Sequence, residues 1–561
     1  MDLHTYQKYM KAARGIISAD LVLKNANIIN VFTREIITGD VGIVDGMIIG
    51  IGSYKGEAEI DLTGKYICPG FIDSHLHFES TMVTPAELVV QAARCGTTTF
   101  IADPHESANV SGVTGIDYIL EQTCDVPANV FVMMPSCVPA TTDDDNGAVI
   151  ECGDMKPYLK NGRILGLGEV MDYRAVVEGR PAMFDKLSLF SDRICDGHAP
   201  FLNEKELQAY ALARIATDHE CSTYEYAMQE RRCGMHVLIR EGSGARNLDA
   251  IVRGIVADGG NTEGFCFCTD DKHIEDIIGE GHINYNVKRA VELGIDIIKA
   301  ICMATIQPAK CYGLKDLGAV AAGYQADLVV FDNLQDLNVE AVFHRGVKLD
   351  QTEPKIKPCH PDLKQTVNIG SFLPKDLQLE NRAVLSVIRL VPGELLTEAV
   401  PWSRDEGMFT ADGRYQKIAV IERHKQTGKA GVGIVEGFSL CGGAIASSVS
   451  HDSHNIVVIG DNDEDMVLAV RELVRAQGGY TIVSNHRVYE TLELPIMGLM
   501  SERGYEYVSQ TLKRMLIKAH EMGVPQGIEP FINLSFLALP VIPEIRITSR
   551  GIYQVTESRF L

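Results

Sequence analysis

Short apolar segments alternate with helical stretches from residue 68 to about residue 310, and this alternation constrains the fold more than any other feature. Six of the segments are TTTFIAD (97–103), NVFVMMPS (129–136), ILGLGEV (164–170), ICDGH (194–198), HVLIRE (236–241) and GFCFCTDD (264–271). Repeated strand–helix units are typical of a parallel sheet. About eight units in roughly 240 residues predict an α/β fold closed as a (β/α)8 TIM-like barrel. A doubly wound open sheet is the alternative, although no glycine-rich dinucleotide loop follows the first strand.

The segments on either side of this region have β character. Residues 20–67 alternate apolar runs with turn residues, and Gly39-Asp40 and Asp45-Gly46 are hairpin signals. Residues 318–350 return to the same pattern. We therefore expect the barrel (68–317) to be inserted into a small β-sandwich made of residues 1–67 and 318–360. The proline-rich segment TEPKIKPCHPDL reads as a linker, and residues 370–561 are long enough for a C-terminal α+β domain.

The composition narrows the class of function. Apolar residues make up 46% and charged residues 23% of the 561-residue chain, as in soluble globular proteins. The formal charge of −23 disfavours nucleic acid and anionic membranes as partners, and it suits a small neutral substrate. No signal-peptide pattern or membrane-length apolar run is present, and the 14 cysteines are scattered. We expect a cytoplasmic protein with reduced thiols.

The first motif with chemical content is PGFIDSHLHFES (69–80). Side chains two apart on a strand share a face, so His75 and His77 are expected to point the same way. At the carboxyl end of a barrel strand that direction is the mouth of the active site. Two imidazoles on one face form half of a divalent metal site, but the pair alone is equally consistent with two unrelated histidines.

The ends of later strands decide between these interpretations. Metal-binding or acidic side chains follow the apolar segments at Asp103, Glu106, Glu169, His198, His219, Asp270 and Asp271. One such residue at a strand end is unremarkable, whereas a series of them in order favours a site shared by several strands. The pattern therefore predicts a metal-dependent active site.

These motifs resemble the amidohydrolase superfamily. The resemblance covers residues 20–350 and includes PGFIDSHLH, the later His, His and Asp positions, and the closing run QPAKCYGL…GAVAAGYQADLVVFD. Within the superfamily, IDSHLHFESTMVTP, ADPHESANV, GLGEVMDY and the C-terminal SVSHDSHN resemble the adenine deaminase family. That resemblance implies hydrolysis of adenine, a small purine base, to hypoxanthine and ammonia, and by analogy a homo-oligomer.

The resemblance also implies two divalent metal ions. The residues at the matching positions are His75, His77 and Asp270 for one metal, His198 and His219 for the other, and Glu169 as a bridge. Because Glu169 is already a carboxylate, no modified lysine is needed. Nitrogen and oxygen ligands without cysteine are compatible with manganese, iron or zinc.

Deamination also requires proton transfers, which a nearby carboxylate can perform. We favour Glu106 and Asp103 as the proton-handling pair, with Asp270 as a ligand and possible base. Glu169 is a candidate for bridging or for proton transfer, and the sequence leaves this open. Arg240 and Ser243, after a barrel strand, are weak candidates for contacting the purine, and ordinary loop polarity explains them equally well.

A second polar motif lies in the C-terminal region. SVSHDSHN (448–455) places His451 and His454 just before an apolar strand, where they either contact the substrate over the barrel mouth or belong to a hydrogen-bonded turn. The run DNDED (461–465) lacks the glycine of a calcium loop and predicts the start of a helix.

Two other functions remain possible on these observations. One is a different amidohydrolase acting on a cyclic amide or amidine, such as an imidazolone or dihydropyrimidine ring. The other is a non-catalytic scaffold of the same fold, although such a scaffold is expected to have lost metal ligands.

Overall fold

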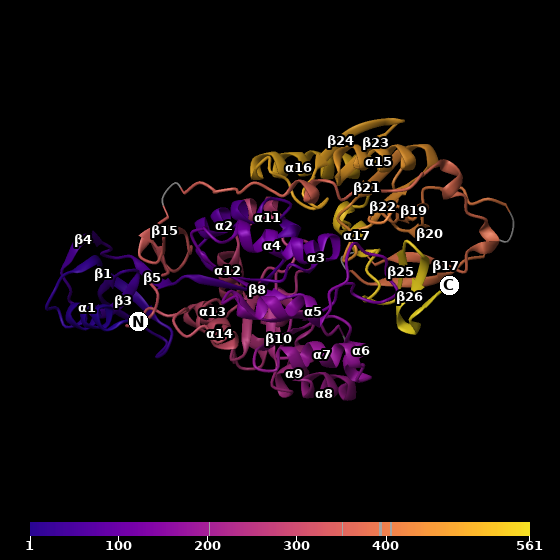
Figure 1. Cartoon of the computed structure of the whole chain (residues 1–561). Coiled ribbons are helices and arrows are strands. Elements are labelled where there is room, and N and C mark those ends of the chain that lie inside the picture. The colour runs from indigo at the N-terminus through magenta and orange to yellow at the C-terminus, as the bar shows by residue number, and fades with distance from the viewer. Residues whose placement is uncertain (201, 350–351, 392–394, 404–406) are drawn as a thin grey trace.

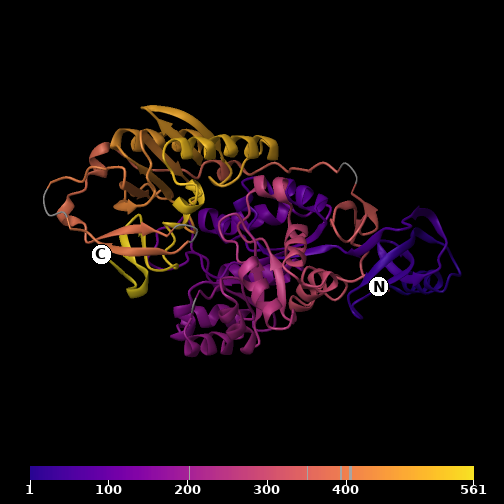
Figure 2. The same ribbon diagram turned by 180° about the vertical axis from the view of Figure 1, so that it is seen from behind.

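The computed structural model describes residues 1–200, 202–349, 352–391, 395–403 and 407–561. It is a mixed α/β structure in which the N-terminal β unit and the C-terminal region lie on different sides of a central region of strands and helices (Figure 1). The view from behind in Figure 2 shows the same arrangement. In the described part of the chain, no helix combines the length and the apolar character that crossing a membrane requires.

The N-terminal β unit is built from two distant segments of the chain. After helix α1 (Leu3–Ala13) come β1 (Ala19–Asn30), β2 (Glu35–Val44), β3 (Met47–Gly52), β4 (Gly56–Asp61) and β5 (Tyr66–Pro69). Strands β14 (Leu328–Phe331), β15 (Val339–His344) and β16 (Val347–Lys348) join the same sheet in the order β16-β15-β14-β5-β1-β2-β3, with β4 on β1. The antiparallel pairing of β14 with β5 returns the chain to this unit after the central region.

One of the two predicted hairpin turns is confirmed and the other is wrong. Asp45 and Gly46 have positive φ angles and connect β2 to β3. Gly39 and Asp40 instead lie inside β2. The reason is a bulge in β1, where the Asp40 carboxylate accepts hydrogen bonds from Lys24 Nζ (2.6 Å) and the Asn25 amide (3.1 Å). Asp40, of a residue type common in turns, here accepts hydrogen bonds from the bulged residues of β1.

The central region contains eight parallel strands in two sheets. One sheet holds β6 (Phe71–Leu76), β7 (Thr97–Ala102), β8 (Asn129–Met134), β9 (Ile164–Val170) and β10 (Ile194–Gly197). The other holds β11 (Thr217–Asp218), β12 (His236–Arg240) and β13 (Phe265–Cys268). Each of the six segments quoted from the sequence contains one of these strands. Their nearly continuous apolar composition agrees with burial on both faces.

Hydrogen bonds also join the two sheets at both seams. At one seam the Asp270 amide donates to the His75 carbonyl over 3.0 Å. At the other, the Ala216 amide donates to the Cys195 carbonyl over 2.9 Å. The parallel strands therefore curl toward one another around a common interior.

Helices follow the parallel strands along the chain. They are α2 (Pro85–Arg94), α3 (His105–Ser111), α4 (Val113–Gln122), α5 (Cys152–Met155), α6 (Tyr173–Val177), α7 (Pro181–Leu189), α8 (Glu204–Leu212), α9 (Tyr224–Arg232), α10 (Leu248–Ala257), α11 (Ile274–Glu280), α12 (Ile283–Glu292), α13 (Ile297–Met303) and α14 (Ile306–Cys311). The predicted linker has no helix or strand over residues 352–360.

The C-terminal region combines a large sheet with three helices. The sheet contains β17 (Ser386–Leu390), β18 (Thr397–Pro401), β19 (Tyr415–Ile421), β20 (Ala430–Glu436), β21 (Gly443–Ser447), β22 (Ile456–Gly460), β23 (Gly479–Ser484) and β24 (Arg487–Glu493). The other elements are α15 (Asp463–Ala476), α16 (Tyr505–Glu521), α17 (Pro530–Phe536), β25 (Ile545–Thr548), β26 (Gly551–Gln554) and β27 (Arg559–Phe560). Helix α15 begins where DNDED predicted a helix, and the Asn462 side chain caps it. The SVSHDSHN loop connects β21 to β22.

Candidate metal centre and active site

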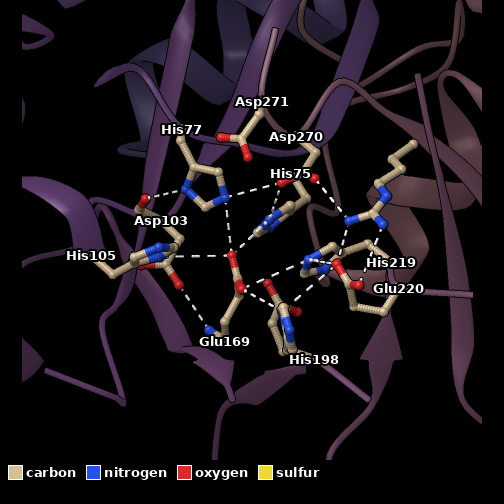
Figure 3. Close-up of polar contacts among 12 residues, drawn as sticks. His75, His77, Asp103, His105, Glu169, His198, His219, Glu220, Asp270 and Asp271 are labelled. Atoms are coloured by element: carbon tan, nitrogen blue, oxygen red, sulfur yellow. Dashed lines mark hydrogen bonds and ion pairs between the residues drawn. The ribbon is translucent and has the colours of Figure 1, made fainter. Parts of the chain in front are cut away.

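The ends of five parallel strands bring the six predicted metal ligands together. They come from or directly follow β6, β9, β10, β11 and β13. They are His75, His77, Glu169, His198, His219 and Asp270, whose side chains Figure 3 shows together. All six side chains are buried. Because parallel strands present their carboxyl ends at one edge, residues far apart in sequence meet there.

Glu169 stands at the centre of this group. Its Oε1 lies 3.0 Å from Nε2 of both His75 and His77, and Asp270 Oδ1 lies 3.5 and 3.1 Å from the same two nitrogens. Neither His75 Nε2 nor Glu169 Oε1 has a hydrogen-bond partner, although both are buried. Buried polar atoms without partners, gathered on two histidines and two carboxylates, fit a divalent cation.

The other oxygen of Glu169 faces a second pair of histidines. Glu169 Oε2 lies 3.1 Å from His198 Nδ1 and 3.7 Å from His219 Nε2. These three residues form a second buried group of metal-binding type. The two oxygens of one carboxylate thus serve two separate histidine pairs, which is the arrangement of a bridging ligand.

The electrostatics of these residues reflect their close packing. Burial raises the pKa of Glu169, but the surrounding histidines, His219 first, outweigh it and hold the pKa well below its usual range. Burial lowers the pKa of His75, but Glu169 reverses this and raises it to about 10. Burial and the neighbouring His75 lower the pKa of His219 to about 3. A proton on His75 balances the nearby carboxylates, and a bound cation would replace it, because ligating histidines must be neutral.

Asp103 and Glu106 occupy different parts of the site. Asp103 Oδ2 accepts a hydrogen bond from the Glu169 amide (2.8 Å), and the Asp103 carbonyl lies 2.9 Å from His77 Nδ1. Glu106, in the first turn of α3, accepts a hydrogen bond from Ser80 Oγ (3.1 Å). Asp103 Oδ1 and Glu106 Oε2 are both buried without a partner. Each carboxylate therefore keeps one oxygen free for a proton.

Arg240 contacts one of the predicted metal ligands, whereas Ser243 bonds to a residue outside that group. The Arg240 guanidinium pairs with Glu220, and its Nη1 donates to Asp270 Oδ2 over 3.2 Å. The Ser243 hydroxyl donates to Asp276 and does not line the cavity described below. Arg240 is thus in contact with Asp270, and Ser243 bonds to the first turn of α11 in this structure.

The SVSHDSHN loop reaches carboxylates of the central region. His451 Nδ1 lies 3.3 Å from Glu106 Oε1, and His451 Nε2 lies 3.7 Å from Asp271 Oδ2. His454 Nε2 lies 3.9 Å from Glu106 Oε2. Asp452 approaches His105, whose Nε2 lies 3.7 Å from Asp452 Oδ1. The C-terminal region therefore supplies polar groups to the same site.

A small cavity lies between the metal-binding side chains and the C-terminal region. One wall carries His77, Glu169 and Asp270, and the C-terminal wall carries His451, Asp452, Phe536, Leu539 and Ile542. Polar groups thus line both walls, and Phe536, Leu539 and Ile542 add an apolar surface on the C-terminal side. This mixture of polar and apolar groups suits a flat heterocycle.

Sequence reasoning assigned no individual role to five residues of this site, although it noted Asp271 at the end of its strand. They are Ser80, His105, Glu220, Asp271 and Asp452. Four of them stand beside residues that were proposed, in DPHE, TDHE, TDD and SHDS, so their position in those runs was the available signal. The apolar wall around Phe536 had no such signal.

Comparisons with known proteins cover nearly the whole chain. The amidohydrolase family model matches residues 66–349, and the model of the adenine deaminase C-terminal domain matches residues 394–559. An adenine deaminase of Desulfitobacterium hafniense (strain Y51) is 55% identical and covers 99% of this chain and 98% of its own length. An adenine deaminase of Clostridium acetobutylicum is 46% identical with 100% coverage of both chains.

A likeness to solved structures covers a smaller part. The crystal structure of a beta-aspartyl dipeptidase from Fervidobacterium islandicum AW-1 matches 61% of this chain and 99% of its own, with 16% identity and a TM-score of 0.45. A TM-score at this level carries no argument about the site.

Proposed function

Because the chain belongs to the adenine deaminase family of the amidohydrolases, we propose that it hydrolyses adenine to hypoxanthine and ammonia. The observation that carries the proposal is the Glu169 carboxylate, whose two oxygens face two separate pairs of buried histidines. This site opens on a cavity lined by polar groups and by the apolar side chains Phe536, Leu539 and Ile542. The described part of the molecule thus provides the groups that metal-assisted hydrolysis of a C–N bond requires.

The proposed frame of the site is a complete (β/α)8 barrel inserted into the N-terminal β unit. The hydrogen bonds at both seams of the parallel strands support closure, and the pairing of β14 with β5 supports insertion. The proposed domains are the β unit of residues 1–67 with 318–360, the barrel of residues 68–317 and the C-terminal domain of residues 370–561. Strand β5 crosses the first of these bounds and extends to Pro69.

The proposed cofactor is a pair of divalent metal ions, which nitrogen and carboxylate ligands allow to be manganese, iron or zinc. His75, His77 and Asp270 would hold one ion, His198 and His219 the other, and Glu169 would bridge them. When bound, such ions lower the pKa of water from 15.7 towards ~7 and so supply hydroxide near neutral pH.

The remaining groups handle protons and orient the purine. Attack at C6 requires a proton on a ring nitrogen and then one on the leaving amine. Asp103 Oδ1 and Glu106 Oε2, both without partners, are the proposed proton carriers, and a well-placed carboxylate contributes ~10²–10⁴-fold. Arg240 fixes Asp270, the other possible base. His451, which lines the cavity, and His454, which faces Glu106, are the proposed substrate-side groups of the C-terminal region.

Metal removal and replacement test this function. The enzyme is stripped with a chelator, reloaded separately with manganese, iron or zinc, and assayed for ammonia and hypoxanthine from adenine. Imidazolone and dihydropyrimidine rings serve as alternative substrates. We expect activity on adenine to disappear on chelation and to return with at least one metal. If the reloaded protein turns over only the alternative rings, the family chemistry stands but adenine is wrong. Binding of well under one metal ion per chain favours a scaffold.

Three properties of the whole protein remain part of the proposal. The partner is a small purine base, the protein forms a homo-oligomer, and it works in the cytoplasm. The 14 cysteines, all of which lie in described residues, are unpaired in agreement with a reducing compartment. Light scattering of the purified protein measures the oligomeric state.

A further inference from the structure

A segment of the barrel, residues 143–147, lies between helix α3 and the C-terminal region and contacts both. It follows β8 and has the sequence DDDNG. We call it the acidic segment. Its contacts with α3 lead to Glu106, and its contacts with the C-terminal region lead to the SVSHDSHN loop.

On the barrel side, the acidic segment is attached to α3. Asn146 Nδ2 donates to Asn109 Oδ1 over 3.0 Å, and the Gly147 amide donates to the Asn109 carbonyl over 2.9 Å. A Cβ at Gly147 would lie 2.1 Å from the Val110 carbonyl oxygen, so only glycine allows this approach. Asn109 lies about one helical turn after Glu106, and the contact therefore holds the turn of α3 that follows Glu106.

On the other side, Asp145 holds the C-terminal region. Its carbonyl accepts a hydrogen bond from Asn455 Nδ2 (2.6 Å), and its carboxylate accepts from Ser549 Oγ and Arg550 Nη2, each over 2.8 Å. Lys429 Nζ lies 3.1 Å from the same carboxylate. Asn455 is the last residue of the SVSHDSHN loop and directly follows His454.

The geometry inside that loop shows what is being positioned. The Ser450 amide donates to His454 Nδ1 over 3.1 Å, so the proton of the neutral imidazole is on Nε2, which faces Glu106. This tautomer has no lone pair on Nε2 for a metal, which argues against a cation between Glu106 and the two histidines. His451 approaches the other oxygen of Glu106 at 3.3 Å. The loop therefore places one histidine beside each oxygen of the Glu106 carboxylate.

We propose that Asp145 is a positioning residue for the SVSHDSHN loop and Glu106. Its carboxylate anchors the acidic segment to Ser549 and Arg550. The anchored segment then holds Asn455 through the Asp145 carbonyl and Asn109 through Asn146. The proposal rests on the proposed function, because it assigns importance to the placement of Glu106, His451 and His454. Displacements of about 1 Å at a reacting centre can cost ~10²-fold in rate, so loss of this attachment is expected to act at a distance.

The test compares Asp145→Ala with a matched control. Arg174→Ala also removes a contact between barrel and C-terminal region, since Arg174 Nη2 donates to the carbonyls of Val555 and Thr556, away from the SVSHDSHN loop. We expect D145A to lower kcat for adenine by ~10- to 100-fold with metal content unchanged, and R174A to stay within about twofold of wild type. Arg550→Ala, which breaks the same attachment from the other side, should follow D145A and serves if D145A does not fold.

A double-mutant cycle separates positioning from general damage. In a His451→Ala background, where the positioned group is gone, D145A is expected to lower kcat little further. An equal loss in both backgrounds overturns the proposal.

Hydrogen exchange provides a readout that does not need activity. We expect faster exchange in peptides covering 448–455 in D145A and R550A, but not in R174A. Unchanged exchange in both D145A and R550A also overturns the proposal. If wild-type protein fails to deaminate adenine while exchange responds as expected, the proposed function is wrong and the attachment stands.

Discussion

Replacing Glu169 with glutamine is the sharpest perturbation of the proposed metal centre. The change keeps the size of the side chain but removes its charge and replaces one oxygen with an amide nitrogen that does not ligate. His75 and His77 retain Asp270 as a carboxylate partner, at 3.5 and 3.1 Å. The pair His198 and His219 has no comparable carboxylate to take the place of Glu169, because the nearby Glu220 is already paired with Arg240.

The expected size of the effect follows from the distances. Unit charges 4 Å apart interact by about 4 kcal/mol at the effective dielectric constant of ~20 that suits protein sites. Glu169 lies within 3.0–3.7 Å of all four histidine nitrogens, so a cation among them would lose an interaction of at least this order. Because ~1.4 kcal/mol is a factor of ten, we expect the weaker ion to bind at least ~10³-fold less tightly.

The assay measures bound metal and turnover together. E169Q, purified and reloaded like wild type, is expected to retain about one metal ion and to lose at least ~10²-fold in kcat. The matched control is Glu87→Gln, another buried glutamate, which lies in α2 and bonds to Gln91. If E169Q keeps two ions and kcat within tenfold of wild type, Glu169 is not a bridging ligand.

Three further predictions follow from the same contacts. Adding metal to stripped protein should raise Tm, since a ligand at 100 times its Kd stabilises the native state by ~2.7 kcal/mol, and an unchanged melting curve contradicts a native metal site. Asp73→Ala should weaken metal binding ~10–100-fold without removing a ligand, because Asp73 accepts hydrogen bonds from the amides of His75 and Thr269, and titration with metal measures this. Burial raises the pKa of Asp145, but Arg550, Ser549 and Lys429 outweigh it and lower the pKa. Its contribution to stability is therefore present above the unfolded pKa of ~3.9 and lost as the pH falls below it, so the Tm difference between wild type and D145N should shrink from pH ~6 to pH ~3.

The sequence predicted the parts of the fold that depend on local pattern. Apolar runs such as HVLIRE and GFCFCTDD identified parallel strands, because strands buried on both faces leave little choice of residue. The site ligands were visible for a related reason: residues such as Glu169 and Asp270 end those runs, and parallel strands bring their ends together. Gly39-Asp40 misled because the same residue types serve turns and bulges.

The sequence did not predict contacts made between distant regions. Nothing local to Asp145 indicates that it meets Arg550 and Asn455, since these contacts depend on how two regions pack. The burial of Phe536 against His451, with ring centroids 4.5 Å apart, has the same origin. Glu106 and Asp103 were proposed as a pair because both are carboxylates that follow the same apolar run, and the turn into α3 directs them toward different partners.

Hydrolysis of adenine in water enriched in ¹⁸O tests the central claim most directly. If the metal-loaded protein deaminates adenine by adding water at C6, the hypoxanthine formed carries ¹⁸O at that carbon and ammonia appears in equal amount. The stripped protein and E169Q, run in parallel, should form little labelled product. Adenine recovered unchanged from the metal-loaded protein, or hypoxanthine formed without the label, would contradict the account.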